Sequence, residues 1–543
     1  MDSAFVGHVH ALRLALTDPR FDACAVPGAF AVQPAARGAL DKAAADAAGD
    51  GAGPYADRLA AGAEAAGTTV QRPDLGTLVA AVPATTAERD AAVAAVAAVD
   101  EEAVRLRTAV KSRDGFFTTF CISPYSRYIA RWCARRGLTP NQVTTASLLT
   151  ALIAAGCAAT GERWGYVAAG VLLLVSFVLD CTDGQLARYS LQYSTMGAWL
   201  DATFDRAKEY SFYAGLALGA ARNGDDVWGL ALAAMILMTC RHVVDFSFNE
   251  ANHDATANTS PTAALSDRLD SVGWTVWVRR MIILPIGERW AMIAVLTAVT
   301  TPRTVFYALL AGCAFGAVYT TAGRVLRSLT RRATRTDRAA QALADLADSG
   351  VLAWTGGPRT PARYRPGYSA LLLAAAGSAL MAGGAATRGF ADPWLIATAA
   401  AYAAFAGAAV SGPLKGPLDW LVPPLFRCAE YVTVLALAAK ADVPGALPAA
   451  FGLVAAVAYH HYDTVYRIRG GSGAPPRWLV RATGGHEGRV LLTVVLAAVL
   501  PRDAFPVALT ALAVYVALVV LVESIRFWVS SGAPAVHDEG EPA

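Results

Sequence analysis

The hydrophobic pattern divides the chain into one polar region followed by two apolar ones. Residues 1–110 are rich in alanine, carry charges at regular intervals and contain no apolar run of the about 20 residues that a membrane span needs. Within them, the run 77–84 predicts a buried strand. The capping-box pair Thr85 and Glu88 predicts a helix that continues to about Lys111. This region therefore predicts a small soluble α/β domain.

Two sets of apolar segments follow, and each segment is close to spanning length. The first set lies at roughly 141–160, 165–182, 197–220, 227–246, 285–302 and 304–324. The second set lies at roughly 367–386, 393–411, 419–441, 446–462, 488–501 and 505–526. Between the sets, the polar residues predict a linker that contains a surface helix. The pattern predicts an all-α polytopic membrane protein with two six-helix transmembrane units.

The segment before the first span has the pattern of an amphipathic helix. Apolar residues alternate with arginines at helical spacing, namely Tyr125, Tyr128, Ile129 and Trp132 with Arg127, Arg131, Arg135 and Arg136. Such a helix suits an anionic membrane surface, so membrane lipids are expected partners. The predicted organisation is a soluble cytosolic domain (1–110), an amphipathic juxtamembrane helix (111–136), a six-span domain (137–330), a cytosolic linker (331–366), a second six-span unit (367–530) and a tail (531–543).

Arginine is concentrated in the loops on one side of the predicted spans. This side carries Arg135, Arg136, Arg188, Arg241, Arg279, Arg280 and the cluster from Arg324 to Arg335, whereas each loop on the opposite side carries one arginine. The positive-inside rule places the basic side in the cytoplasm. The first 30 residues show no apolar core of signal-peptide type. We expect a multi-pass protein of the plasma membrane whose N-terminus stays in the cytosol.

The second set of spans resembles the first. The stretch FDRAKEYSFYAGLAL (204–218) matches LFRCAEYVTVLALA (425–438), which aligns Arg206, Glu209 and Tyr210 with Arg427, Glu430 and Tyr431. Weaker matches follow in register, such as PIGERWAMIAVL with HEGRVLLTVVL. We interpret this as an internal duplication. The alternative is coincidence among helices rich in alanine, valine and leucine.

Composition supports a membrane protein and excludes several other classes. Hydrophobic residues make up 55% of the chain and charged residues only 16%, against roughly 25% in soluble domains. The net charge of +3 gives no indication of a nucleic-acid partner. The eight cysteines are scattered singly, without a CxxC pair or a histidine at ligand spacing, so neither a disulfide framework nor a zinc site is expected.

Four aspartates interrupt the apolar helices of the first set. Asp180 and Asp183 are separated by three positions, and Asp201 and Asp205 by four, so each pair projects from one helical face. A carboxylate inside a membrane helix costs roughly 3 kcal/mol on insertion scales, and four uncompensated ones would cost on the order of 10 kcal/mol. We therefore expect the four carboxylates to converge on a compensating charge. Ion pairing with Arg188, Arg206 and Lys208 is the purely structural alternative.

The arrangement of these residues resembles the signature of a known family. Residues 180–205 read DxxDGxxAR, eight residues and then GxxxDxxxD, which is similar at every fixed position to the signature of CDP-alcohol phosphotransferases. The resemblance covers the six spans from about 137 to 330, and extends to phosphatidylinositol-phosphate synthase and inositol-phosphodiester synthase-like members. It implies that a phospho-alcohol group moves from a CDP-alcohol such as CDP-diacylglycerol to an acceptor hydroxyl, with release of CMP.

The resemblance also implies roles for individual residues. Asp180, Asp183, Asp201 and Asp205 would hold two Mg²⁺ or Mn²⁺ ions, and Asp205 would also be the base for the acceptor hydroxyl. The implied CDP-binding residues are Asn141, Thr144, Asp180, Asp183, Gly184, Ala187, Arg188 and Gly197. Arg241, Arg280 and Arg324 would bind a phosphate on the acceptor, as in members that use inositol phosphate. Helix capping is the alternative for Asn141 and Thr144, and membrane anchoring is the alternative for the three arginines.

The second unit cannot assemble the same metal site. The alignment places Val422 and Phe426 where Asp201 and Asp205 stand. Because members of the family commonly form homodimers, the hypothesis is an intrachain pseudo-dimer in which this pseudo-catalytic half replaces a second subunit; a homodimer of whole chains stays open. His460 is expected to be structural. Residues 1–110 lack a glycine-rich phosphate loop, so any relation to the nucleotidyltransferase domain of bifunctional members would be a remnant.

Other functions remain to be separated from this one. A transporter could combine two related six-helix halves with buried acids, but its site would draw on both repeats. An enzyme acting on prenyl diphosphates would need aspartates and Mg²⁺, but not the DGxxAR element. Within the resembled family, glycerol phosphate is an alternative acceptor, and inositol-phosphodiester synthesis is an alternative reaction.

Overall fold

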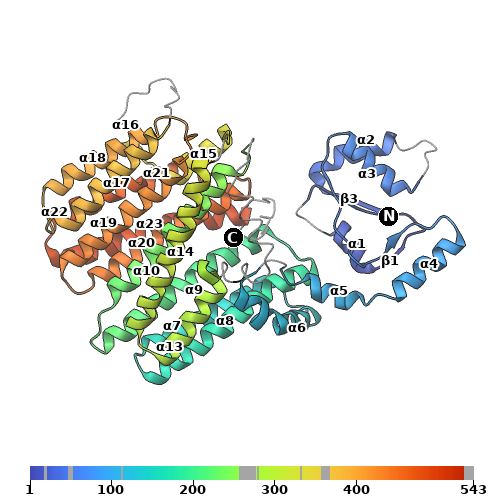
Figure 1. Cartoon of the computed structure of the whole chain (residues 1–543), viewed down its shortest axis with the longest axis horizontal. Coiled ribbons are helices and arrows are strands. Elements are labelled where there is room, and N and C mark those ends of the chain that lie inside the picture. The colour runs from blue at the N-terminus through green and yellow to red at the C-terminus, as the bar shows by residue number, and fades with distance from the viewer. Residues whose placement is uncertain are drawn as a thin grey trace.

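The computed structural model describes residues 1–17, 21–46, 53–111, 114–255, 277, 281–330, 333–355 and 367–530. Helices α7 to α23 pack into one large bundle, and a small α/β region lies to one side of it (Figure 1). Helices α5 and α6 connect the two parts (Figure 1). The chain is mostly helical, as the apolar pattern predicts.

The N-terminal region combines short strands with helices, in agreement with the predicted α/β pattern. Its elements are β1 (Val6–Gly7), α1 (Val9–Leu16), β2 (Ala23–Val26), β3 (Ala29–Val32), α2 (Arg37–Asp46), α3 (Tyr55–Ala65), β4 (Val70–Gln71) and β5 (Ala80–Ala81). Strand β2 pairs antiparallel with β3 and parallel with β4, while β1 pairs antiparallel with β5. Ala15, Val26 and Ala29 form a small core. The strand predicted at 77–84 is confined to β5.

The helix predicted from Thr85 to about Lys111 is wrong as a single element. The structure has two helices there, α4 (Thr86–Ala97) and α5 (Glu101–Thr108). The predicted cap of the first is confirmed, because Thr85 accepts a hydrogen bond from the Glu88 backbone. Asp100 accepts hydrogen bonds from the backbone N–H groups of Glu102 and Ala103, and so it caps a second helix that changes direction.

The amphipathic segment forms α6 (Ser123–Arg135), preceded by a π-helical turn at Thr118–Ile122. Tyr125, Tyr128 and Trp132 are exposed, whereas Ser126 on the opposite face is buried and donates a hydrogen bond of 2.8 Å to Gln185 of the neighbouring span. The predicted helix is present, but its buried face consists of small residues, Ser123, Ser126, Ala130 and Cys133, and was not predicted.

Every predicted apolar segment contains a helix. In the first set these are α7 (Pro140–Ala159), α8 (Arg163–Ser190), α9 (Thr195–Arg222), α10 (Trp228–Asn252), α13 (Ile286–Val299) and α14 (Pro302–Thr330). In the second set they are α17 (Ser369–Thr387), α18 (Trp394–Ala409), α19 (Val422–Ala441), α20 (Ala446–Arg469), α22 (Gly485–Val499) and α23 (Phe505–Ser530). Among the described residues, seven helices are long and apolar enough to cross a membrane: α7, α8, α10, α14, α17, and α19 and α23 with their preceding 3₁₀ turns. The other helices are shorter or carry more charge.

The helix predicted in the linker is present, but the prediction that it lies on the surface is wrong. Residues of α15 (Asp337–Ala347) pack against α10 and α19, and Leu343 and Leu346 are fully buried. The physical reason is an apolar stripe at spacings of three and four, which this helix buries like any amphipathic helix of a core. The chain then continues through α16 (Val351–Thr355).

A buried ion network holds the first unit together. Glu209 of α9 accepts from Arg206 at 2.9 Å, from Arg289 of α13 at 3.1 Å and from the Tyr213 hydroxyl at 2.6 Å. All four side chains lie inside the bundle. One glutamate therefore ties α9 to α13.

The second unit contains the same network at the aligned positions. Glu430 of α19 accepts from Arg427 at 2.7 Å and from Arg489 of α22 at 2.5 Å. Both arginines also contact Asp348, which lies just after α15. The matching geometry of Glu209 and Glu430 supports the interpretation of an internal duplication, because coincidental similarity among apolar helices would not reproduce a buried charge arrangement.

The two units meet along α10. This helix packs against α19 and α20 of the second unit, and α9 touches α20 and α23. Aromatic contacts line the meeting surface, such as Trp228 with Phe451 at 5.6 Å between ring centroids. The bundle is therefore continuous across both units (Figure 1).

The Glu430 network leads to a stability prediction. Replacing Glu430 by glutamine should destabilise the protein by about 3–5 kcal/mol, because two buried arginines lose a shared counter-charge. Thermal unfolding in detergent measures the effect. Glu64→Gln is the control, since Glu64 pairs with Arg72 on the exposed surface and should change the transition little. Equal transitions for the two variants would contradict the prediction.

Candidate active site

A short turn joins the end of α8 to the start of α9, and helix α7 packs against both helices. Helix α8 ends at Ser190, followed by Leu191 in the left-handed conformation (φ 54°). Ser194 then begins α9, because its hydroxyl accepts a hydrogen bond of 2.9 Å from the Gly197 backbone. Helix α7 packs against both α8 and α9. The acidic residues of α8 and α9 are therefore presented to a common space.

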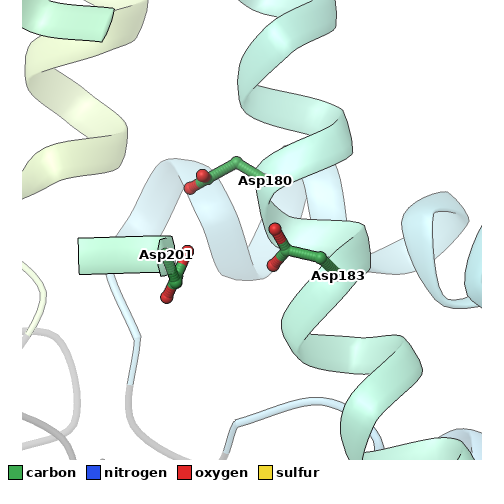
Figure 2. A group of neighbouring side chains, drawn as sticks. All are labelled: Asp180, Asp183 and Asp201. Carbon is green, nitrogen blue, oxygen red and sulfur yellow. The ribbon is translucent and has the colours of Figure 1, made fainter. Parts of the chain in front are cut away.

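Three of the four aspartates converge in that space. Asp180 and Asp183 of α8 and Asp201 of α9 each offer one carboxylate oxygen, and these oxygens lie within 4.8 Å of one another. Figure 2 shows the three side chains pointing toward one another from the two helices. The Oδ2 atom of Asp183 is buried without a hydrogen-bond partner. Oxygen-only ligands at this spacing, with an oxygen left unsatisfied, fit a hard divalent cation.

Asp205 joins this group through a lysine. The fully buried Lys208 ammonium is 2.8 Å from Asp205 Oδ1, forms an ion pair with Asp180 and lies 3.3 Å from the Ser147 hydroxyl. Ion pairing, the structural alternative, is thus real for Lys208. Four carboxylates and one ammonium still leave a formal charge of −3 at the site. One lysine therefore compensates only part of the acidic charge.

Lys208 is the site residue that sequence reasoning did not assign. Its position three residues after Asp205, on the same helical face, was the available signal. The sequence offered three cations as pairing partners without distinguishing them. The structure distinguishes them, since Arg206 pairs with Glu209 and Arg188 lies toward α5.

The residues proposed to bind the nucleotide lie beside the carboxylates. A Cβ atom on Gly197 would lie 2.9 Å from Asn141 Oδ1 and 2.8 Å from Ser194 Oγ, so a larger residue would displace these two side chains. The Thr144 side chain interacts with the Asp183 carboxyl group. Helix capping does not explain Asn141 or Thr144, because Thr139 performs that role at the start of α7.

The arginine of the DGxxAR element lies along its own helix. A Cβ atom on Gly184 would lie 3.4 Å from Arg188 Nη1, so the guanidinium passes over the glycine. Arg188 Nε donates a hydrogen bond of 2.6 Å to the Ala109 carbonyl, which follows α5. Ala187, which directly precedes Arg188, has only a methyl side chain. This side chain is therefore oriented by a residue outside the six spans.

The three arginines proposed for the acceptor are not assembled by the described residues. Arg241 is buried and donates to the Ile283 carbonyl. Arg324 forms an ion pair with Asp245. Arg280 lies outside the described residues. The phosphate clamp stays a prediction.

The second unit replaces the acidic group with apolar packing. Val422 and Phe426, aligned with Asp201 and Asp205, are completely buried, and the Phe426 ring stacks on His486 at 4.3 Å between centroids. Within residues 367–530, no comparable group of metal-ligating side chains occurs. His460 lies 3.1 Å from Asp348, which agrees with the structural role expected for it.

Comparisons with known proteins divide the chain in the same way. Residues 137–318 match the CDP-alcohol phosphatidyltransferase family, and residues 337–543 match a family of unknown function (DUF5941). The chain is 38% identical over 93 residues to an archaetidylinositol phosphate synthase of Pyrococcus horikoshii, covering 17% of this chain and 47% of that protein. It is 36% identical over 123 residues to a phosphatidylinositol phosphate synthase of Mycolicibacterium smegmatis, covering 22% and 53%.

A third relative is a bifunctional IPC transferase and DIPP synthase of Rubrobacter xylanophilus. It is 34% identical over 152 residues, covering 28% of this chain and 31% of that protein. The chain thus spans about half or less of the length of the curated relatives it matches. The match to the CDP-alcohol phosphatidyltransferase family lies in the unit that carries the carboxylates.

The carboxylate group predicts cation binding that does not depend on any substrate. Asp183→Asn should weaken Mn²⁺ binding by about tenfold or more, equivalent to ~1.4 kcal/mol, because a ligand oxygen loses its charge. Titration of purified protein followed by electron paramagnetic resonance measures free Mn²⁺ directly. Glu250→Gln, which removes a buried carboxylate of α10 outside the group, is the control. Equal Mn²⁺ affinities in the two variants would contradict the prediction that this carboxylate group binds the cation.

Proposed function

We propose, from the premise that residues 137–318 form a CDP-alcohol phosphatidyltransferase domain, that the chain is a membrane phosphotransferase. It would transfer a phospho-alcohol group, such as phosphatidyl, from a CDP-alcohol to an acceptor hydroxyl and release CMP. The observation that carries the proposal is the convergence of Asp180, Asp183 and Asp201 beside Lys208 and Asp205. All of these residues come from α8 and α9 of one unit. A transporter site would instead draw on both related halves.

Two divalent cations, Mg²⁺ or Mn²⁺, fit the acidic group. Asp180, Asp183, Asp201 and Asp205 would be their ligands, and the Asp183 oxygen without a hydrogen-bond partner supports this. Bound cations would supply neutralisation of the donor diphosphate and polarisation of its phosphoryl oxygens. Lys208 would keep the Asp180 and Asp205 carboxylates in place.

The remaining residues would bind the donor and move the proton. Arg188 would pair with a diphosphate oxygen, and Gly184 lets the donor approach α8 closely. Gly197 and Asn141 would border the cytidine. Asp205 would accept the proton of the acceptor hydroxyl as its oxygen attacks the β-phosphorus. The bond from that phosphorus to the bridging oxygen breaks, and CMP leaves with the electron pair.

Inositol phosphate is the acceptor that we propose. Two relatives are named as an archaetidylinositol phosphate synthase and a phosphatidylinositol phosphate synthase. Arg241, Arg280 and Arg324 are the candidate residues for the acceptor phosphate. The concentration of arginine on the same side as Asp180 supports a site at the cytoplasmic face of the plasma membrane. Glycerol phosphate is the alternative acceptor within the same reaction class.

The acceptor is tested by CMP release from CDP-diacylglycerol by purified protein with Mg²⁺ or Mn²⁺. Inositol phosphate should support turnover at least about tenfold faster than unphosphorylated inositol, because the basic residues contact only the phosphorylated compound. Glycerol phosphate is tested in parallel, and a higher rate with it would change the proposed acceptor. Absence of CMP with every acceptor would refute the enzyme.

Removal of the proposed base gives a second prediction. Asp205→Asn should lower kcat by about 10²–10⁴-fold, because the amide cannot accept the acceptor proton. The thermal transition should not fall, since Lys208 keeps its pairing with Asp180. Glu250→Gln, which removes a buried carboxylate of the neighbouring span α10 outside the site, is the control, and it should retain a far larger share of the turnover. A kcat for Asp205→Asn close to that of the unmodified protein would exclude the base role.

A further inference from the structure

Two side chains of the second unit contact the helix that carries Asp201 and Asp205. Trp528 of α23 stacks on Trp199 of α9, with 6.0 Å between ring centroids and 18° between planes. Tyr462 of α20 lies under Arg206 of α9, whose guanidinium carbon is 5.4 Å from the centre of the ring. The two contact points lie just before and just after the stretch of α9 that carries both carboxylates.

Tyr462 is held in place by two side chains of the first unit. Its hydroxyl lies 2.5 Å from Nδ1 of His242 on α10, and the same nitrogen is 3.5 Å from Arg206. The tyrosine is 3% exposed, so this contact is part of the interior. Arg206 in turn is fixed by Glu209. Tyr462 therefore restrains Arg206, the residue that follows Asp205.

Trp528 is oriented by polar groups of its own unit. Its indole nitrogen donates a hydrogen bond of 2.7 Å to Asp463, which also accepts from Ser524 at 2.7 Å and pairs with Arg467 at 2.9 Å. Trp528 is 3% exposed. The orientation of the indole ring toward Trp199 is thus supported by hydrogen bonds and an ion pair within the second unit.

Helix geometry relates these contacts to the carboxylates. At about 100° per residue, positions 199 and 206 lie on the same face of α9, separated by about two turns. Positions 201 and 205 fall on roughly the opposite face. Packing of Trp528 and Tyr462 against one face therefore restrains the rotation of α9 and its position along the helix axis. A rotation of α9 would move both carboxylates away from Asp180 and Asp183.

We propose that Tyr462 and Trp528 are positioning residues of the second unit, which hold α9 so that its carboxylates meet those of α8. The inference rests on the proposed function and extends it, because it gives the non-catalytic unit a task in the reaction. One face of α9 is used for support and the other for cation binding. The metal site then depends on residues that lie more than 250 positions later in the chain.

The test compares Tyr462→Phe and Trp528→Leu with Phe451→Leu. Tyr462→Phe removes the hydroxyl that ties Tyr462 to His242, so the ring against Arg206 loses its anchor while folding should persist. Trp528→Leu removes the stacking partner of Trp199. Both should weaken Mn²⁺ binding by about tenfold and lower kcat with little change in the KM for CDP-diacylglycerol, as loss of ligand-supporting contacts does. Phe451→Leu alters the same interface at Trp228 of α10, away from α9, and should leave Mn²⁺ affinity unchanged.

The possible outcomes separate the two proposals. Unchanged Mn²⁺ affinity in both Tyr462→Phe and Trp528→Leu would overturn the positioning role, whatever happens to activity. Equal weakening in Phe451→Leu would also overturn it, because the effect would then reflect general loosening of the interface. Mn²⁺ titration needs no turnover, so it tests the positioning role even if unmodified protein releases no CMP. Absence of CMP release by the unmodified protein would refute the proposed reaction, whereas the Mn²⁺ affinities of the variants bear only on the positioning role.

Discussion

The structure depends on the cost of placing charged side chains inside a helical membrane bundle. A carboxylate there must be balanced, since removing one partner of a buried pair costs about 3–5 kcal/mol. Glu209 and Glu430 meet this requirement in the same way. Each pairs with one arginine of its own helix and with one arginine of a later helix. These two networks fix how α9 and α19 sit in their units. The position of the aspartates on α9 therefore depends on the Glu209 network.

The two units depart from this shared frame at one place. In the first unit, Asp180, Asp183, Asp201 and Asp205 exceed the single charge of Lys208 and leave acidic charge for cations. In the second, the positions of Asp201 and Asp205 are apolar, and Phe426 fills the space by stacking on His486. Neutral packing needs no cation. On the proposed function, the second unit keeps the supporting ion pairs but lacks the metal ligands.

Sequence reasoning predicted what short-range pattern determines. Helices occur at all the predicted apolar segments because long apolar runs favour membrane helices. Asp180, Asp183 and Asp201 meet as expected, since a spacing of three positions puts Asp180 and Asp183 on one helical face. Contacts between distant segments were not accessible in this way. The burial of α15, the choice of Lys208 over two other cations and the hydrogen bond from Arg188 to Ala109 all depend on tertiary packing. The break at Asp100 was missed for a local reason, since a second cap competed with a long helix.

The contact between the units gives a physical reason for joining them in one chain. A metal site made from two helices is only as well defined as the rotation of those helices, and an error near 1 Å can cost about 10²-fold in rate. Helix α8 is fixed by α7, α13 and α6, whereas α9 has a face turned toward the second unit. Covalent linkage guarantees that this face is always covered by Tyr462 and Trp528. Duplication followed by loss of one set of carboxylates would then preserve the support while leaving one catalytic centre.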